Sequence, residues 1–154
     1  MEIKEVTDCN QKEMIARRVL HDLPEWFGIP DALEHYITES RKKPFLACFD
    51  NGHVVGFVVL HETSKDCAEI FVMGVVRVYH RKGIGRQLNA AYEDLARRSG
   101  YSYSQVKTVQ MGHYEEYDAT NNFYLAMGYK ELECFPGLWD SWNPCQVYVK
   151  HLRT

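Results

Sequence analysis

The chain has 154 residues, a length typical of one domain with a single hydrophobic core. Hydrophobic residues make up 45% of it and charged residues 25%, which excludes a disordered, collagen-like or supercharged chain. The net charge is -3, so the strongly basic surface of a nucleic-acid-binding protein is absent, and no anionic membrane is an obvious partner. We therefore expect one domain over residues 1–154.

The cysteine and histidine patterns bear on compartment and metal binding. The five cysteines are odd in number, and no two are spaced as Cys-x-x-Cys. Neither a disulfide framework nor a zinc ribbon is expected, and reduced thiols in the cytoplasm fit better. The first residues lack a signal-peptide pattern, and the longest apolar runs are only strand-length. The sequence predicts a cytoplasmic protein that does not cross a membrane, and no histidine spacing predicts a metal site.

The first third of the chain is expected to form a strand and two helices. Alternation predicts a strand over 2–7. Asn10, with Glu13 three residues later, resembles a capping box that starts a helix. Proline and glycine in 23–30 end that helix, and Pro30 is well placed to begin the second.

The rest of the chain alternates between predicted strands and helices. Strands are predicted over 45–49, 54–60, 68–78, 103–110, 129–135 and 145–151, and helices over 84–99 and 120–127. Gly74 lies inside a strand, where it indicates a bulge or a close approach of backbone. The order strand-helix-helix-strand-strand-strand-helix-strand-helix-strand-strand predicts an α/β (α+β) fold, a mixed sheet with helices on both faces.

A glycine-rich turn joins the strand over 68–78 to the helix that follows. Its residues are His80, Arg81, Lys82, Gly83, Ile84, Gly85 and Arg86. Glycines let successive N–H groups converge on one anion, and a helix start adds free N–H groups and the positive end of a dipole. The basic side chains add charge, so the pattern predicts a pyrophosphate site. A Walker loop or dinucleotide fingerprint does not fit, since position 88 is leucine and no Gly-Lys-Ser/Thr follows.

These residues resemble the pyrophosphate motif of the GNAT superfamily of acyl-CoA-dependent N-acyltransferases, Gln/Arg-x-x-Gly-x-Gly/Ala. His80 stands where the family has Gln or Arg, and this departure affects one side chain of a motif that binds mainly through backbone N–H groups. The resemblance extends upstream to 68–70 and 73–75. Downstream, 121–129 is similar to the family's Phe-Tyr-x-x-x-Gly-Phe/Tyr segment. Three motifs in the family's order predict the family's fold.

The resemblance implies acetyl-CoA as cosubstrate and direct transfer of an acetyl group to an amine. In such enzymes the strand before the turn splays from its neighbour at a bulge, and its backbone bonds the pantetheine arm of the cofactor. Gly74 then marks the bulge, and Met73 and Val75 are the expected backbone partners. Asn121 or Asn122 would bond the pantetheine amides, although asparagine also caps helices.

Acetyl transfer requires a group that takes the amine proton and a donor to the departing thiolate. Tyr124 matches the family tyrosine whose phenol reaches the cofactor sulfur. Glu69 lies on the central strand and is the candidate base, directly or through water. The alternatives for the base are His113, Glu115 and Glu116, in the loop expected after the fifth strand.

Two aromatic loops are candidates for the acceptor wall. Trp26 and Phe27 lie between the first two helices, and Trp139 lies in a second loop over 138–144 that, facing Glu115, could attract a cationic amine. The expected acceptor is a primary amine of a small molecule. A peptide or protein amine, a non-catalytic acyl-CoA sensor and a nucleotide-binding module remain alternatives. Dimers are common in this family, so a homodimer stays an open expectation.

Overall fold

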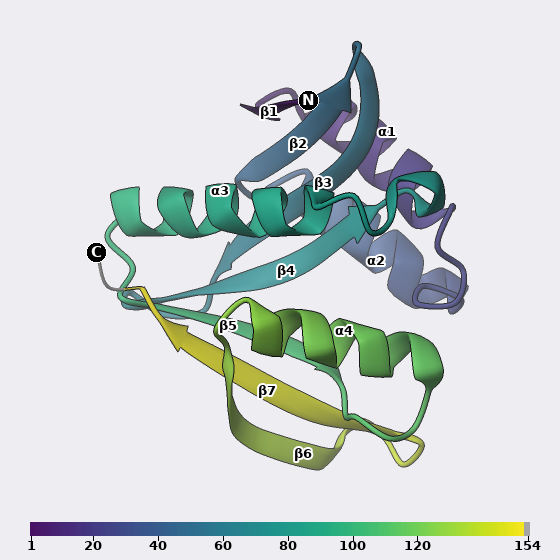
Figure 1. Ribbon diagram of the computed structural model, residues 1–154, viewed down its shortest axis with the longest axis vertical. Helices are drawn as coiled ribbons and strands as arrows, with labels where there is room; N and C mark the ends of the chain where they lie inside the picture. The colour runs from purple at the N-terminus through teal and green to yellow at the C-terminus, as the bar shows by residue number, and fades with distance from the viewer. Residues whose placement is uncertain (153–154) are drawn as a thin grey trace.

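The computed structural model describes residues 1–152, in which seven strands form one mixed sheet of order β1-β2-β3-β4-β5-β7-β6 (Figure 1). The strands are β1 (Glu2–Glu5), β2 (Phe45–Asp50), β3 (His53–Glu62), β4 (Cys67–Val75), β5 (Tyr103–Val109), β6 (Lys130–Asp140) and β7 (Asn143–His151). The helices are α1 (Cys9–Leu20), α2 (Pro30–Ser40), α3 (Ile84–Arg98) and α4 (Glu115–Ala126), with a 3-10 helix at Arg77–Tyr79. The predicted α/β fold and order of elements are confirmed.

Helices cover both faces of the sheet (Figure 1). α1 and α2 pack together on one face, where α1 contacts β3 and β4. α3 packs on β2, β3 and β4 on the opposite face, and α4 follows it there against β5. β4 and β5 are parallel, whereas the other neighbouring strands are antiparallel. Within residues 1–152 no helix has the length and apolar character needed to cross a membrane.

α1 begins at a different cap from the one predicted. The Asp8 side chain accepts a hydrogen bond from the Gln11 N–H at 2.8 Å, so Asp8, not Asn10, caps the helix. Glu13 does not close a capping box. Its carboxylate forms an ion pair with Arg41 at 2.7 Å and so fastens α1 to the segment that follows α2.

The bulge in β4 lies at Phe71, and not at Gly74. The register between β3 and β4 shifts by one residue there, so Phe71 has no partner on β3, whereas Gly74 is regularly paired. A Cβ atom at Gly74 would lie 3.1 Å from Val19 and 3.2 Å from Leu23. Glycine at this position therefore lets the α1 segment approach the sheet closely. The bulge expected at Gly74 is therefore wrong, and the groups that approach Gly74 are side chains of the α1 segment and not backbone.

β4 ends earlier than predicted and gives way to a 3-10 helix. The strand stops at Val75, and Arg77–Tyr79 form one turn before the glycine-rich segment. The Arg77 N–H donates to the Asp22 carboxylate at 2.6 Å, and the Arg77 side chain is paired with Glu25. These bonds hold the end of β4 against the loop between α1 and α2.

Two later elements are longer than predicted. α4 begins at Glu115, so Glu115, Glu116 and Asp118 form its first turn and do not lie in a loop. Acidic residues are favoured there because the helix dipole is positive at its N-terminus. β6 continues to Asp140, which places Trp139 on a strand and not in a loop.

Candidate active site

The site lies where the parallel strands β4 and β5 separate. Their pairing covers residues 67–69 of β4 and 103–105 of β5. Beyond these residues the two ribbons diverge, while β5 continues along β7 as far as Val109 (Figure 1). Residues 70–75 of β4 therefore keep β3 on one side and have no strand partner on the other. We call this divergence the opening, and Glu69 lies at its apex.

The backbone of β4 directs hydrogen-bonding groups into the opening. The Val76 N–H donates to Val55 O on β3 at 2.9 Å. The N–H and C=O groups of successive residues point to opposite sides of a strand. Since those of Val76 face β3, those of Met73 and Val75 point away from β3. The two residues predicted as backbone partners thus present a strand edge to which an extended ligand can bind.

The glycine-rich turn ends at the N-terminus of α3 with its backbone N–H groups available. Gly83 is the N-cap residue, with φ +81° and no side-chain cap, and Arg81 also has a positive φ of +62°. The uncapped first turn leaves N–H groups of Ile84 and its neighbours for an anion. Arg81, Lys82 and Arg86 are exposed, and none of the three forms an ion pair within residues 1–152.

Gly85 serves the packing of α3 against α4. Its φ is not positive, so conformational freedom does not explain the residue. A Cβ atom here would lie 3.2 Å from Cε1 of Phe123 in α4. At Gly83 the reverse holds, because φ is positive and the surrounding space is open. The two glycines of the motif are thus required for different reasons.

His80 turns back toward β4 and links it to the loop between α1 and α2. Its Nε2 lies 2.6 Å from Val75 O, and its ring meets that of Trp26 edge-on at 6.0 Å. Trp26 Nε1 donates to Thr120 Oγ1 at 3.1 Å and to Glu116 O at 3.2 Å. The loop between α1 and α2 therefore joins the end of β4 to the first turns of α4.

Tyr124 is buried on α4, on the other side of the opening from β4. It is 6% exposed, and its ring packs against those of Phe123, Tyr129 and Tyr148. Burial raises the pKa of Tyr124 well above its ordinary value, the nearby Tyr36 adds to the rise, and no residue within 1–152 hydrogen-bonds the hydroxyl. The phenol therefore stays protonated at neutral pH and is free to donate.

Glu69 is 7% exposed, and its Oε2 accepts a hydrogen bond from Lys107 Nζ at 2.7 Å. The carboxylate is therefore largely shielded from solvent. Glu69 pairs with His61 on β3, so the two side chains share one face of the sheet. His61 contacts Phe71, which contacts Tyr36 of α2, so this is the α2 face. The candidate base thus lies at the apex of the opening, already bonded to a lysine that sequence analysis did not single out.

Asn121 belongs to the core, so its prediction as a cofactor ligand is corrected. It is fully buried, and its Nδ2 donates to Val109 O at 2.8 Å and to Tyr117 O at 2.6 Å. Its Oδ1 accepts from the Tyr148 hydroxyl at 2.5 Å. Asn121 therefore ties α4 to β5 and β7, whereas the neighbouring Asn122 is exposed and free to contact a ligand.

An aromatic group lines the α2 face beside Glu69. Phe27 meets Tyr36 at 5.8 Å between ring centroids, and Tyr36 meets Phe71 at 5.3 Å. Phe71 is the bulge residue, two positions after Glu69, and Tyr36 falls at helical spacing, so both are indistinguishable from core residues in the sequence. Trp139 lies on β6, is 43% exposed and is outside this group.

The three alternative candidates for the base lie in the first turn of α4 or just before it. His113 Nε2 is 3.4 Å from Gln110 Oε1, Glu115 is exposed in the first turn of α4, and Glu116 accepts the Trp26 bond through its carbonyl. In the described part of the chain, no group of three or more His, Cys, Asp and Glu side chains is placed to hold a metal ion.

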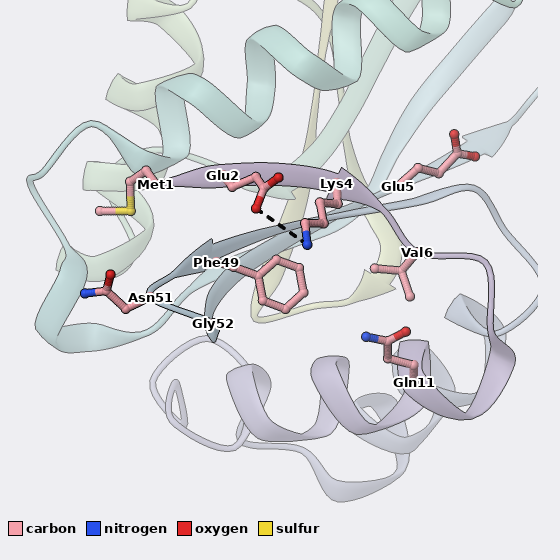
Figure 2. Close-up of a pocket in the computed structure, with 9 residues that line it drawn as sticks. All are labelled: Met1, Glu2, Lys4, Glu5, Val6, Gln11, Phe49, Asn51 and Gly52. Atoms are coloured by element: carbon pink, nitrogen blue, oxygen red, sulfur yellow. Dashed lines mark ion pairs between the residues drawn. The ribbon is translucent and has the colours of Figure 1, made fainter.

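A hollow of about 500 Å³ lies elsewhere, beside β1 at one edge of the sheet (Figure 2). It is lined by Met1, Glu2, Lys4, Glu5, Val6, Gln11, Phe49, Asn51 and Gly52. None of the predicted site residues lines it, and β2 and β3 separate it from β4. The candidate site is therefore defined by strand pairing at β4 and not by this hollow.

Comparisons with known proteins agree with this geometry. A family model described as the acetyltransferase (GNAT) family matches residues 11–129. A protein assigned to the GNAT acetyltransferases of Desulfovibrio desulfuricans has a TM-score of 0.84 at 15% identity, over 99% of each chain. An aminoglycoside 6'-N-acetyltransferase complexed with coenzyme A has a TM-score of 0.79 at 18% identity, over 100% of this chain and 98% of that one. The Enterococcus faecium aminoglycoside 6'-N-acetyltransferase has a TM-score of 0.79 at 17% identity, with the same coverage. Identities this low show a shared fold. Curated protein sequences give no match.

Proposed function

The chain belongs to the acetyltransferase (GNAT) family, and on that basis we propose that it transfers an acetyl group from acetyl-CoA to a primary amine of a small molecule. The observation that carries the proposal is the free edge of β4. Beyond Glu69 this edge is no longer paired with β5, and the chain then leads through the glycine-rich turn to the uncapped N-terminus of α3. A cofactor that combines an extended amide arm with a pyrophosphate matches both features.

The residues present fit acetyl-CoA. The peptide groups of Met73 and Val75 can pair with the amides of the pantetheine arm, provided that His80 releases Val75 O. The backbone of 81–86 can hold the pyrophosphate, with the side chains of its basic residues as additional partners. Asn122, exposed on α4, replaces Asn121 as the candidate for a side-chain contact with the arm.

The chemistry requires two proton transfers, one to this chain from the amine and one from this chain to the departing sulfur. Acetyl-CoA supplies a thioester, whose carbonyl carbon accepts the amine lone pair while the sulfur leaves with the electrons of the C–S bond. Glu69 takes the proton that the amine loses, directly or through one water, and Lys107 orients its carboxylate. Tyr124 donates a proton to the departing sulfur, and its raised pKa keeps that proton in place until then. The products are an acetamide and a free thiol.

Two of the similar structures are aminoglycoside acetyltransferases, which supports a small-molecule acceptor. The test is a panel of polyamines, aminoglycosides, amino acids and short peptides with acetyl-CoA, in which release of free thiol is measured. We expect thiol release that depends on a small amine. Binding of acetyl-CoA without release in the presence of any amine would contradict the proposal and indicate a sensor.

A further inference from the structure

Lys43 is a half-buried cation on the α2 face of the sheet, the face of Glu69, and it has no carboxylate partner within residues 1–152. Its Nζ lies 3.1 Å from His61 Nδ1 and 4.9 Å from the centre of the Phe71 ring. An ammonium group has three N–H donors and no acceptor. The imidazole takes one of them, so Lys43 has hydrogen-bonding capacity to spare.

The neighbouring acidic side chains are already engaged with other lysines. Glu39 pairs with Lys42 at 3.2 Å, and Glu69 pairs with Lys107 at 2.7 Å. Each of these lysines has its own carboxylate, whereas Lys43 forms no ion pair within residues 1–152 and interacts with Glu39 only at longer range. Lys43 is therefore the cation of this group that has no carboxylate within hydrogen-bonding distance in the described residues.

Capping of α2 does not explain where the Lys43 ammonium points. The carbonyl oxygens beyond the end of α2 are satisfied by Lys12, whose Nζ donates to Lys43 O at 2.8 Å and to Arg41 O at 3.5 Å. Lys43 instead extends across the sheet toward β3 and β4. Lys12 also brings a second ammonium to this loop.

His61 is suited to hold Lys43 as a neutral acceptor. Burial lowers the pKa of His61, and Lys43 and Lys107 lower it further, while Glu69 and Glu39 act in the opposite direction. A neutral imidazole can accept through Nδ1, so His61 orients the Lys43 ammonium without cancelling its charge.

Phe71 connects Lys43 to the apex of the opening. This bulge residue stands two positions after Glu69, and Lys43 lies over its ring. His35, Tyr36 and His61 pack against the same ring. A molecule beside this aromatic cluster with its amine at Glu69 would bring its other end to Lys43. We propose that the acceptor is an amine that also carries a carboxylate, which Lys43 binds. The inference rests on the proposed acetyl transfer and names its substrate class.

The test compares three matched series of equal carbon number with acetyl-CoA: ω-amino acids, n-alkylamines and α,ω-diamines, each of three to six carbons. We expect the ω-amino acids to have the highest kcat/KM. Lys43→Met should lower their kcat/KM about 10- to 100-fold, the effect of losing a charge-assisted hydrogen bond. The loss should lie mainly in KM, and the n-alkylamines should be unaffected. Lys43→Arg, which keeps the charge, should retain much of the preference.

Lys42→Met is the matched control, because Lys42 is an exposed neighbour that pairs with Glu39. It should leave all three series unchanged. Equal rates for ω-amino acids and n-alkylamines, a preference for diamines, or an unchanged preference in Lys43→Met would each overturn the inference and leave acetyl transfer standing. Failure of every amine to release thiol would overturn the proposed function, and the inference with it.

Discussion

Glu69 and Lys107 form an ion pair, with 2.7 Å between Oε2 and Nζ, at the point where β4 and β5 part. One residue comes from each strand, so the pair fastens the last paired positions and fixes the direction of the carboxylate. An amine that reaches the apex of the opening therefore meets a carboxylate that Lys107 has already oriented.

Glu69→Gln should slow acetyl transfer at pH 7 with little change in shape, because an amide cannot accept the amine proton. The rate should recover as the pH rises, since an amine with a pKa of about 10 then becomes available without a base. The measurement is the pH–rate profile from pH 6 to 10, with Glu5→Gln, an exposed residue of β1, as the control. A wild-type profile for Glu69→Gln would remove Glu69 from the mechanism and direct attention to His113, Glu115 and Glu116.

Tyr124→Phe should lower kcat by roughly 10²- to 10⁴-fold, the usual range for general acid catalysis, and preserve acetyl-CoA affinity. Stability should hardly change, because no residue within 1–152 bonds the hydroxyl. Tyr129→Phe is the contrasting control, since its hydroxyl is bonded to Ser104 at 2.8 Å and its loss should lower stability. A loss confined to KM in Tyr124→Phe would mean that Tyr124 only binds.

Asn121→Ala should destabilise the fold by about 2–4 kcal/mol, because it leaves buried partners on β5, α4 and β7 without their hydrogen bonds. The folded protein should still bind acetyl-CoA. Asn122→Ala should do the opposite and weaken acetyl-CoA binding at unchanged stability. Urea unfolding and calorimetry separate the two effects. Lost affinity with full stability in Asn121→Ala would restore that residue to the cofactor site.

Gly83→Val and Gly85→Val should both weaken acetyl-CoA binding, by different routes. At Gly83 the positive φ makes any larger residue strained by about 1–3 kcal/mol. At Gly85 the new side chain collides with Phe123. Adding Phe123→Ala should therefore raise the melting temperature of Gly85→Val and not that of Gly83→Val. Calorimetry checks the affinities, and unchanged affinity in both single variants would place the pyrophosphate elsewhere.

His61 should make stability depend on pH. Its pKa in the folded protein is lowered from 6.5, chiefly by burial. Below pH 6.5 the unfolded chain therefore binds a proton that the folded protein still excludes, and stability falls with falling pH until the folded pKa is passed. The loss in urea midpoint between pH 7.5 and 5.5 should be smaller in His61→Gln than in the wild type. The same substitution at the exposed His53 should leave the loss unchanged, and equal losses in all three proteins would contradict the prediction.

The predictions that failed were those of element ends and of individual side-chain partners. The acidic segment 115–118 is part of α4 because a helix dipole favours it, yet the segment has no apolar periodicity by which to recognise a helix. β6 runs on to Asp140 because Asp140 pairs with Asn143 of β7, a contact between strands that local pattern does not reveal.

The sequence by itself determined the order of elements and the glycine-rich turn. Hydrophobic periodicity and the need for a positive φ each depend only on a few neighbouring residues, so a short stretch of sequence reveals them. Only the tertiary structure decided that Phe71 forms the bulge, that Lys107 holds Glu69 and that Asn121 is bonded within the core. Each of these depends on strand register or on a partner far along the chain, and both are set by how the whole core packs. The Lys43 ammonium reaches His61 for the same reason: the segment after α2 meets β3 only in the folded protein.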